Sequence, residues 1–317
     1  MGGKLTEPYS LSGKTVWIAG ETGMVGSATI RRLAAEDCTL LSATRKDFDL
    51  RDQARVATWM KSNRPDVVVV AAATVGGILA NLTRPAEFLY DNLMIESNII
   101  HAAHEAATEK LLFLGSACIY PRDAAQPMAE NALLTGPLEP TNEWYAVAKI
   151  AGIKLCQAYR KQYGADFISA QPNNLYGPGD NFDLQSSHVI PALIRKAHQA
   201  KEAGEATMDI WGTGTPLREF LHVDDLADAL VHLLKFYSGP SHVNIGTGEE
   251  ISIKDLAQTI ARAGEFDGKL NFNADKPDGA PRKLLDARIM KNLGWTSSIR
   301  LDDGIKTTYD WFLETMT

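Results

Sequence analysis

The sequence contains few cysteines and no long apolar run. Its 317 residues include three cysteines, at positions 38, 118 and 156. So sparse and odd a set argues against a disulfide scaffold and favours a reducing compartment, so we expect a cytoplasmic protein. No apolar run approaches the roughly 18 residues that span a bilayer. The short, mostly polar segment from Met1 to Ser12 is not typical of a secretory leader, so we expect no membrane association.

An excess of basic charge is also missing. The chain has 32 Lys and Arg against 39 Asp and Glu, a net charge of −7, which gives no electrostatic reason to expect nucleic acid. No His, Cys, Asp or Glu cluster has zinc-like spacing, so we expect no metal. The acids of His222-Val-Asp224-Asp225 are better explained as a helix N-terminus, where they compensate the helix dipole. Local basic residues can still bind a phosphorylated substrate.

Strand and helix patterns alternate along most of the chain. Apolar runs at 15–19, 40–43, 66–71, 110–115 and 166–170 predict strands, and helical patterns at 24–33, 54–60, 85–107 and 145–163 separate them. This alternation predicts an α/β fold, a Rossmann-type doubly wound parallel sheet. After Gly177 the pattern is less regular, with helices expected at 189–203 and 223–237. We expect a dinucleotide-binding domain over 1–176 and a smaller α/β substrate lobe over 177–317, with 213–250 returning to the first domain.

A glycine-rich turn joins the first predicted strand to the first helix. It comprises Gly20, Thr22, Gly23, Met24, Val25 and Gly26. Glycines at this place let the backbone approach a pyrophosphate that the helix N-terminus binds. A tight turn without a ligand is the alternative, and the strand-turn-helix context favours dinucleotide binding.

The end of the second predicted strand indicates which dinucleotide binds. A site for NAD usually has an acid there, whereas this strand ends in Thr44-Arg45. The planar guanidinium of Arg45 can pair with a 2′-phosphate, so we expect NADP, with NADPH as the hydride donor. A solvated surface charge is the alternative for Arg45. We expect Asp49 and Leu50 to lie over the adenine and Ala72 to lie beneath the cofactor.

Tyr145 and Lys149 lie four residues apart on a predicted helix. Their side chains therefore share one face. A nearby ammonium favours the phenolate of a tyrosine, which makes proton exchange with an alkoxide feasible. Ser116, at the carboxyl end of a central strand, can hydrogen-bond the same carbonyl oxygen. Taken singly, Tyr145 is equally well explained as a residue at the edge of the core, and Lys149 as a solvated charge on the helix. Together with Ser116 and the glycine turn, the two residues predict hydride transfer at a carbonyl.

Several motifs resemble the extended short-chain dehydrogenase/reductase family over essentially the whole chain. They are Gly-Met-Val-Gly-Ser-Ala, Val-Gly-Gly-Ile, Leu-Gly-Ser-x-Cys-Ile-Tyr-Pro, Asn-Leu-Tyr-Gly-Pro, Ser-His-Val-Ile-Pro-Ala-Leu, Arg-Glu-Phe-Leu-His-Val-Asp-Asp and Pro-Arg-Lys-Leu-Leu-Asp. Within this family, the chain more specifically resembles the members that epimerise C3 and C5 of GDP-4-keto-6-deoxy-D-mannose and then reduce C4 with NADPH. It implies this bifunctional activity, a GDP-sugar substrate and a homodimer.

The resemblance also implies roles for individual residues. Cys118 is the implied base and His188 the implied acid of epimerisation, at carbons that a C4 ketone acidifies. If the backbone is extended after Ser116, Cys118 lies close to the same carbonyl. Further cofactor contacts are implied for Leu114, Gly115, Lys149, Pro172, Asn173, Asn174, Leu175 and His188, and substrate contacts for Lys196, Trp211, Arg218, Asp278 and Lys283. Taken singly, Cys118 can also be explained as a small buried apolar residue, and His188 as a hydrogen-bonded histidine of a loop or helix end.

The sequence favours this activity over three others. Sugar-nucleotide dehydratases carry an acidic pair where this chain has Ala117 and Cys118, so a dehydratase is disfavoured. An epimerase or reductase of another nucleotide sugar stays open, and so does a sensor that binds the dinucleotide without catalysis. The intact Tyr145 and Lys149 pair argues against the sensor.

Overall fold

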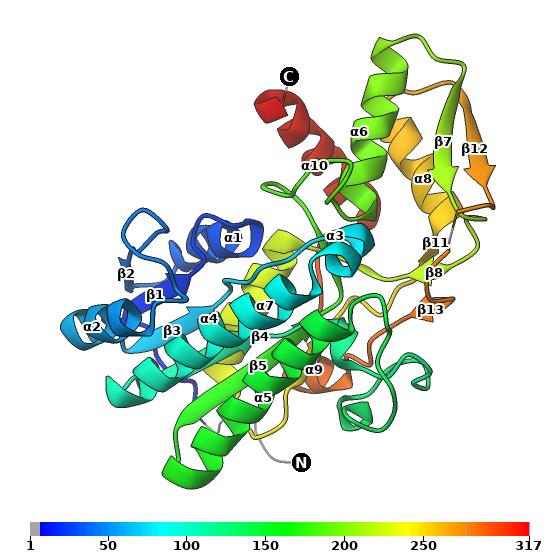
Figure 1. Cartoon of the computed structure of the whole chain (residues 1–317). Coiled ribbons are helices and arrows are strands. Elements are labelled where there is room, and N and C mark those ends of the chain that lie inside the picture. The colour runs from blue at the N-terminus through cyan, green and yellow to red at the C-terminus, as the bar shows by residue number, and fades with distance from the viewer. Residues whose placement is uncertain (1–6, 277, 317) are drawn as a thin grey trace.

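Six parallel strands form the sheet of the larger lobe in this computed structural model, which describes residues 7–276 and 278–316 (Figure 1). The strand order is β10-β5-β4-β3-β1-β2. The bounds are β1 Thr15–Ala19, β2 Thr39–Leu41, β3 Val67–Val70, β4 Lys110–Leu114, β5 Asp166–Pro172 and β10 Val243–Ile245. The order 2-1-3-4-5 is that of a doubly wound fold, whose ligands bind where the order reverses, here between β1 and β3. The predicted fold class is confirmed.

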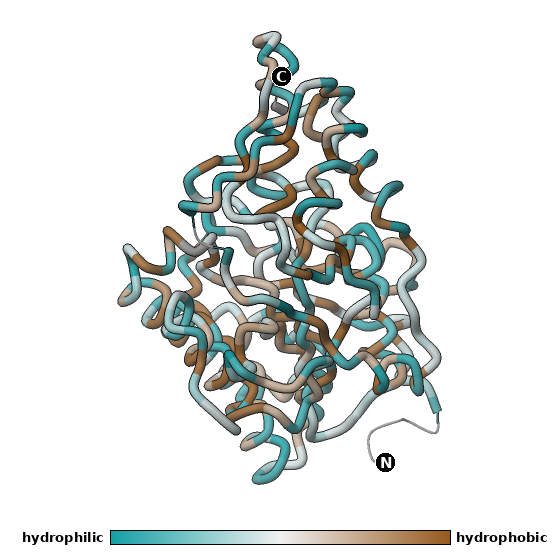
Figure 2. The backbone as a smooth tube through the Cα atoms, turned by 90° about the vertical axis from the view of Figure 1, so that its right-hand side faces the viewer, coloured by the Kyte–Doolittle hydropathy of each residue, from teal (hydrophilic) through white to brown (hydrophobic). Residues whose placement is uncertain are grey.

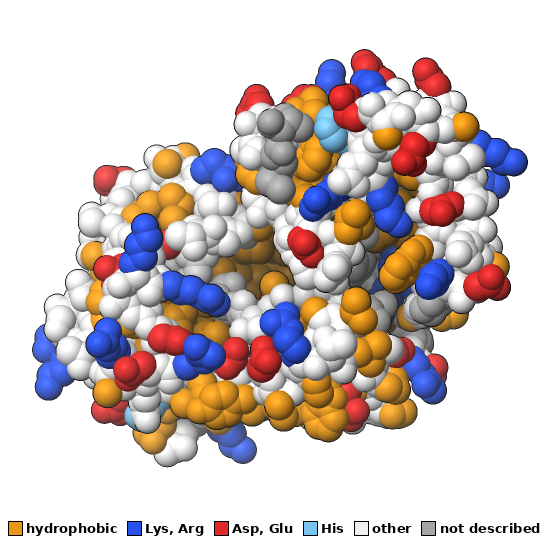
Figure 3. All heavy atoms as spheres, turned by 45° about the horizontal axis from the view of Figure 1, so that its top comes forward, with side chains coloured by type: hydrophobic (Ala, Val, Ile, Leu, Met, Phe, Trp, Pro, Cys, Tyr) orange, Lys and Arg blue, Asp and Glu red, His pale blue; other side chains and the backbone are white. Residues whose placement is uncertain are grey.

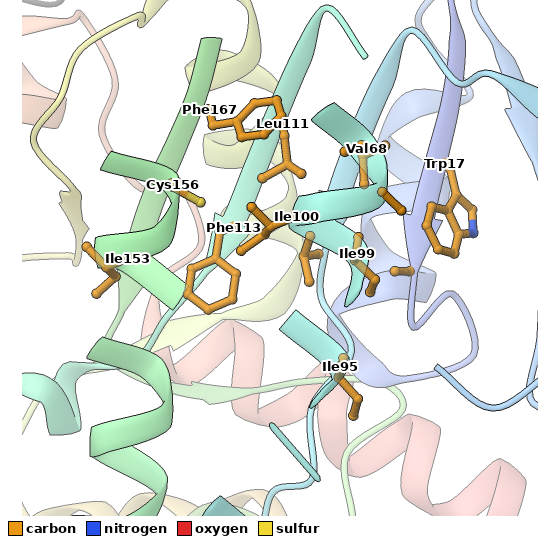
Figure 4. Close-up of a cluster of buried hydrophobic side chains, with 14 of the residues drawn as sticks. Trp17, Val68, Ile95, Ile99, Ile100, Leu111, Phe113, Ile153, Cys156 and Phe167 are labelled. Atoms are coloured by element: carbon orange, nitrogen blue, oxygen red, sulfur yellow. The ribbon is translucent and has the colours of Figure 1, made fainter. Parts of the chain in front are cut away.

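Helices cover both faces of this sheet, which explains the four consecutive valines of β3. Val68 and Val70 belong to the core on one face, with the helices α2, α4 and α5, as Figure 4 shows in part. Val67 and Val69 belong to the core on the other face, with α1, α7 and α9. The helix bounds are α1 Met24–Leu33, α2 Gln53–Asn63, α4 Pro85–Glu105, α5 Glu143–Tyr163, α7 Val223–Phe236 and α9 Arg288–Asn292.

A smaller lobe contains α6 Val189–Glu202, β7 Thr207–Trp211, α8 Ile253–Ala263, β12 Lys269–Asn273 and α10 Leu301–Met316. Its three helices share an apolar core of their own, and Figure 2 shows apolar segments in both lobes. Short strands lie between the lobes: β6 Asn174–Tyr176 pairs with β9 Phe220–His222, and β8 Leu217–Arg218 pairs with β11 Ile251–Ser252 and β13 Arg282–Lys283. Within 213–250, β10 lies in the large sheet and α7 on it, whereas β8 does not join that sheet.

Local details differ from the expected pattern. The second strand runs from Thr39 to Leu41 and not from 40 to 43. The sequence pattern also missed the helices α3, Ile78–Thr83, α8, α9 and α10, and two 3₁₀ turns, η1 Ala117–Ile119 and η2 Glu130–Ala132. The outer ends of the two expected domains, residues 1–6 and 317, lie outside the described residues. Over 7–276 and 278–316, no helix combines the length and the apolar character needed to cross a membrane.

Gly152 lets α5 approach the sheet closely. A Cβ atom at this position would lie 2.4 Å from the ring of Phe113, which is fully buried on β4. Gly152→Ala is expected to destabilise the fold by about 1–3 kcal/mol, because overpacking outweighs the roughly 1 kcal/mol that alanine gains in a helix. Urea unfolding measures the change. Val147→Ala, at an exposed position of the same helix, is the control; equal effects of the two substitutions would contradict the close packing.

Candidate active site

Ser116 and Cys118 lie just beyond β4, at the carboxyl edge of the sheet. Ser116 is the N-cap of η1, and its Oγ accepts a hydrogen bond of 3.5 Å from the backbone N–H of Cys118. The expectation of an extended backbone through Cys118 is therefore wrong: the chain is extended at Ser116 and then turns. The turn keeps the thiol near the hydroxyl, because the cap joins the two residues directly.

The first turns of α5 place Tyr145 and Lys149 beside the same strand end. Lys149 is buried, and its Nζ donates a 2.9 Å hydrogen bond to the carbonyl oxygen of Leu114, the last residue of β4. The ammonium lies 5.9 Å from the ring centre of Tyr145 and 4.7 Å from that of Phe113. Helix α5 and strand β4 thus bring Tyr145, Lys149, Ser116 and Cys118 to one edge of the sheet.

Burial controls the protonation of Tyr145 and Lys149. It raises the pKa of Tyr145 well above its usual value, with smaller effects of Cys118 and Glu96 in the same direction. Burial lowers the pKa of Lys149, and Glu96 opposes that shift. The expected lowering of the Tyr145 pKa by the ammonium is therefore not found in this pocket. A protonated Tyr145 is nevertheless the form that donates a proton to an alkoxide.

The thiol of Cys118 is also held in its neutral form. Burial raises its pKa, while the Ser116 hydroxyl and the ammonium groups of Lys283 and Lys149 act against the shift. Lys283 is the last residue of β13, and burial lowers its own pKa. Two cations are thus placed to stabilise a thiolate when the thiol releases its proton.

His188 lies in the smaller lobe, at the start of α6. It is the N-cap residue of α6, solvent-accessible, and its pKa is lowered by the surrounding protein. The loop after β3 connects its segment to Tyr145: Gly77 N donates a 2.9 Å hydrogen bond to Ser186 O, and Phe88, which packs edge-on against Tyr145, lies close to Gly76. Figure 3 shows the molecular surface hollowed between the lobes.

The glycine turn fits a dinucleotide pyrophosphate. Helix α1 begins at Met24 with no side-chain cap and no acid in its first turn, so its N-terminal N–H groups and positive dipole end are available to an anion. Gly20 has φ +94°, and a Cβ atom at Gly26 would lie 2.1 Å from Gly20 O. Only glycine permits this turn, which also contacts Ala72 after β3.

The other expected cofactor residues lie at the ends of the parallel strands. Arg45, Asp49 and Leu50 follow β2. Leu114 ends β4 and Gly115 comes directly after it, and Pro172 ends β5, just before Asn173 and the strand β6 that contains Asn174 and Leu175. Arg45 is exposed, whereas Asp49 is ion-paired with Arg51 at 2.6 Å. Asn173 is buried and donates to the carboxylate of Glu219. Asn173 therefore has a structural partner in addition to its expected contact.

The expected substrate residues gather around β7, β8 and β13. The ammonium of Lys196 lies 5.7 Å from the ring centre of Trp211, an exposed residue at the end of β7. Arg218 and Lys283 are paired positions of β8 and β13. Neither cation forms an ion pair within 7–276 and 278–316. Asp278 accepts from the backbone and hydroxyl of Thr213 at 2.7 and 2.8 Å, so it stabilises the loop beside Arg218.

His222 is the N-cap of α7, and its Nδ1 accepts from Asp224 N at 3.2 Å, which confirms the N-terminal cap expected from the sequence. In the part of the chain that the structure describes, no group of three or more His, Cys, Asp and Glu side chains is arranged to hold a metal ion.

Glu96 is a feature that the sequence reasoning missed. It lies on α4, is 2% exposed, and neither carboxylate oxygen has a hydrogen-bond partner among the described residues. Burial raises its pKa to about 8, and the Lys149 ammonium acts against this. The signal in the sequence is an acid inside the apolar face Ile95, Ile99 and Ile100. The charge state of Glu96 is thus coupled to that of Lys149.

Glu96→Gln is expected to move the alkaline limb of the pH–rate profile for reduction to lower pH by about one unit. Above about pH 8 Glu96 is ionised and favours the Lys149 ammonium; glutamine removes this support, so Lys149 loses its proton earlier. Tyr145, Cys118 and Cys156 are the other titratable groups near this pair. The measurement is the rate at which the expected cofactor, NADPH, is oxidised, as a function of pH.

The control for this prediction is Glu105→Gln, an exposed position of the same helix. Because the pKa of Glu96 is raised on folding, its ionisation lowers stability as pH rises from its unfolded value toward 8. The Gln variant should therefore be at least as stable as the parent at pH 8. Superimposable pH profiles of the two proteins would contradict the coupling.

A sequence model of the NAD dependent epimerase/dehydratase family matches residues 16–246. The matched stretch runs from β1 through β10 and contains Ser116, Cys118, Tyr145, Lys149 and His188. The chain therefore belongs to this family.

Several relatives that share one name align with nearly the whole chain. The GDP-L-fucose synthase of Sinorhizobium fredii is 57% identical over 305 residues, which cover 96% of this chain and 97% of that protein. GDP-L-fucose synthase 1 of Arabidopsis thaliana is 54% identical over 312 residues, covering 98% and 97%. The solved structure of a GDP-L-fucose synthetase from Naegleria fowleri bound to NADP has a TM-score of 0.93 at 29% identity, covering 100% of this chain and 98% of that chain. The sequence thus places this chain among the GDP-L-fucose synthases.

Proposed function

We propose that the chain converts GDP-4-keto-6-deoxy-D-mannose to GDP-L-fucose by epimerising C3 and C5 and reducing C4, with NADP as its cofactor. The observation that carries this proposal is the meeting of Ser116, Cys118, Tyr145 and Lys149 at the end of β4, in a chain more than half identical to named synthases. A sensor that only binds the dinucleotide does not need this set. Reduction or epimerisation of another nucleotide sugar is the second candidate, and turnover with different nucleotide sugars distinguishes the two.

Tyr145 is the proton donor of the reduction in this proposal. NADPH, when bound, supplies the hydride that C4 receives. Tyr145, protonated because burial raises its pKa, gives its proton to the developing alkoxide. Ser116 hydrogen-bonds the same oxygen, and Lys149 adds positive charge beside it. The N-terminus of α1 would bind the pyrophosphate, with Arg45 placed after β2 for the 2′-phosphate.

Cys118 and His188 carry the epimerisation. The C4 ketone makes the protons at C3 and C5 acidic, so a base on one face of the ring and an acid on the other can invert each carbon through an enolate. The thiolate of Cys118, with Lys283 and Lys149 nearby, removes the proton, and His188 delivers one from the facing lobe. The neutral state of His188 at rest means that it must be protonated before it acts as an acid.

The residues gathered around β7, β8 and β13 would bind the nucleotide diphosphate. Arg218 and Lys283 are adjacent cations suited to the phosphates. Lys196 and Trp211 form a cationic and aromatic pair at the end of β7, and Asp278 stabilises the loop beside Arg218. We assign these residues to the substrate lobe over 177–317, of which about 213–250 returns in part to the cofactor domain over 1–176. A homodimer in the cytoplasm completes the proposal, on the basis of the family resemblance and the sparse cysteines.

The test supplies purified protein with GDP-4-keto-6-deoxy-D-mannose and NADPH in heavy water and analyses the product by NMR. Deuterium at C3 and C5 of GDP-L-fucose, with NADPH consumed, is the expected result. Oxidation of NADPH without ring deuterium would show reduction alone and remove the proposed roles of Cys118 and His188. Turnover only with a different nucleotide sugar would support the second candidate.

A further inference from the structure

Glu21, in the glycine turn, reaches across to the end of the neighbouring strand. Its Oε1 accepts a hydrogen bond of 2.6 Å from Ser42 Oγ, and its Oε2 accepts one of 3.4 Å from Ala43 N. Strands β1 and β2 are parallel neighbours, so their carboxyl ends lie side by side. The contact holds a carboxylate, half-buried, where β2 has just ended.

This place in a doubly wound fold is where the adenosine ribose is recognised. An acid there accepts the 2′-hydroxyl of NAD, and an arginine accommodates the 2′-phosphate of NADP. Residues 42–45, which follow β2, supply Arg45 and no acid. Glu21 brings the acid to this position from the turn after β1. Both recognition groups are therefore present at one strand end.

The other acids near Arg45 already have strong partners. Asp47 accepts from the backbone and hydroxyl of Thr44 at 2.8 and 2.9 Å, and Asp49 is ion-paired with Arg51. Glu21 has one hydroxyl and one long amide contact, and a carboxylate has about four acceptor positions. Glu21 thus retains capacity for a ribose hydroxyl, while its charge opposes a phosphate at the same spot.

We infer that Glu21 determines specificity for the adenosine ribose: it accepts a ribose hydroxyl and repels the 2′-phosphate, so that the protein binds NADH as well as NADPH. Arg45 offsets the repulsion and keeps NADPH a ligand. The inference concerns the affinity for the two dinucleotides and goes beyond the proposed reaction.

The test measures the dissociation constants of NADH and NADPH from nucleotide fluorescence, without sugar substrate. Wild-type protein is expected to bind the two within about tenfold of each other. Glu21→Gln keeps an acceptor oxygen but removes the charge, so it is expected to tighten NADPH by about tenfold and to change NADH by less than about threefold. Glu105→Gln, the same change at an exposed position of α4, should alter neither constant.

Two results would overturn the inference. One is a wild-type preference for NADPH above about a hundredfold, which needs no variant and is unaffected by any folding defect of Glu21→Gln. The other is an unchanged ratio of the two constants in Glu21→Gln, which would make Glu21 only a partner of Ser42. Because no sugar is present, neither result depends on which substrate the protein turns over.

Discussion

Tyr145→Phe is expected to lower the rate of C4 reduction by about 10²–10⁴-fold, the usual loss when a general acid is removed. The phenyl ring keeps the edge-on contact with Phe88 but has no proton to give to the alkoxide. Exchange of the ring protons at C3 and C5 with heavy water should continue, because Cys118 and His188 are intact. Stopped-flow NADPH oxidation and NMR of the recovered sugar measure the two steps separately.

The control for this variant is Tyr163→Phe, an exposed tyrosine at the other end of α5. It should reduce at the parent rate. Parent-like reduction by Tyr145→Phe would assign the proton donor to another group and contradict the arrangement at the end of β4.

Cys118→Ser is expected to slow proton exchange at C3 and C5 by about 10²–10⁴-fold. A serine hydroxyl fits the space of the thiol but is a far weaker acid, so Lys283 and Lys149 cannot stabilise its ionised form at neutral pH. His188→Gln should have an effect of the same order, since the enolate then lacks its proton donor. Deuterium incorporation followed by NMR is the measurement.

Cys38→Ser is the matched control, because Cys38 lies at the end of the α1–β2 connection, away from η1. It should exchange protons at the parent rate. A Cys118→Ser variant that exchanges ring protons normally but fails to reduce C4 would show that the residue serves the reduction and not the epimerisation.

The strongest sequence patterns predicted their elements well, and the physical reason lies in burial. The valines of β3 and the helices around Phe88 and Ile153 face a core, so their hydrophobic periodicity is strict. The same logic placed Tyr145 and Lys149 on one helix. The edge strand β2 has little buried surface and was displaced by one residue at its start and two at its end.

Features without periodicity could not be predicted in this way. The 3₁₀ turn at Cys118 depends on a hydroxyl cap from Ser116, a single contact that no repeating pattern signals. The buried Glu96 looks like a surface residue until α5 is packed against its helix. The contact of Glu21 with the end of β2 could not be predicted, because the ribose-recognising acid is expected after the second strand and here it comes from the turn after the first.

The attachment of His188 to α6 has a consequence for product stereochemistry. Ser116, Cys118, Tyr145 and Lys149 are all carried by the large sheet and α5, whereas His188 begins a helix of the other lobe. In the proposed mechanism the groups that act on C4 therefore belong to one lobe, whereas inversion at C3 and C5 also needs a proton donor from the other lobe. Loosening the contact between Gly77 and Ser186 should release sugar that is reduced without having been inverted. If His188 is the proton donor, the stereochemistry of the product depends on the contacts that hold the two lobes together.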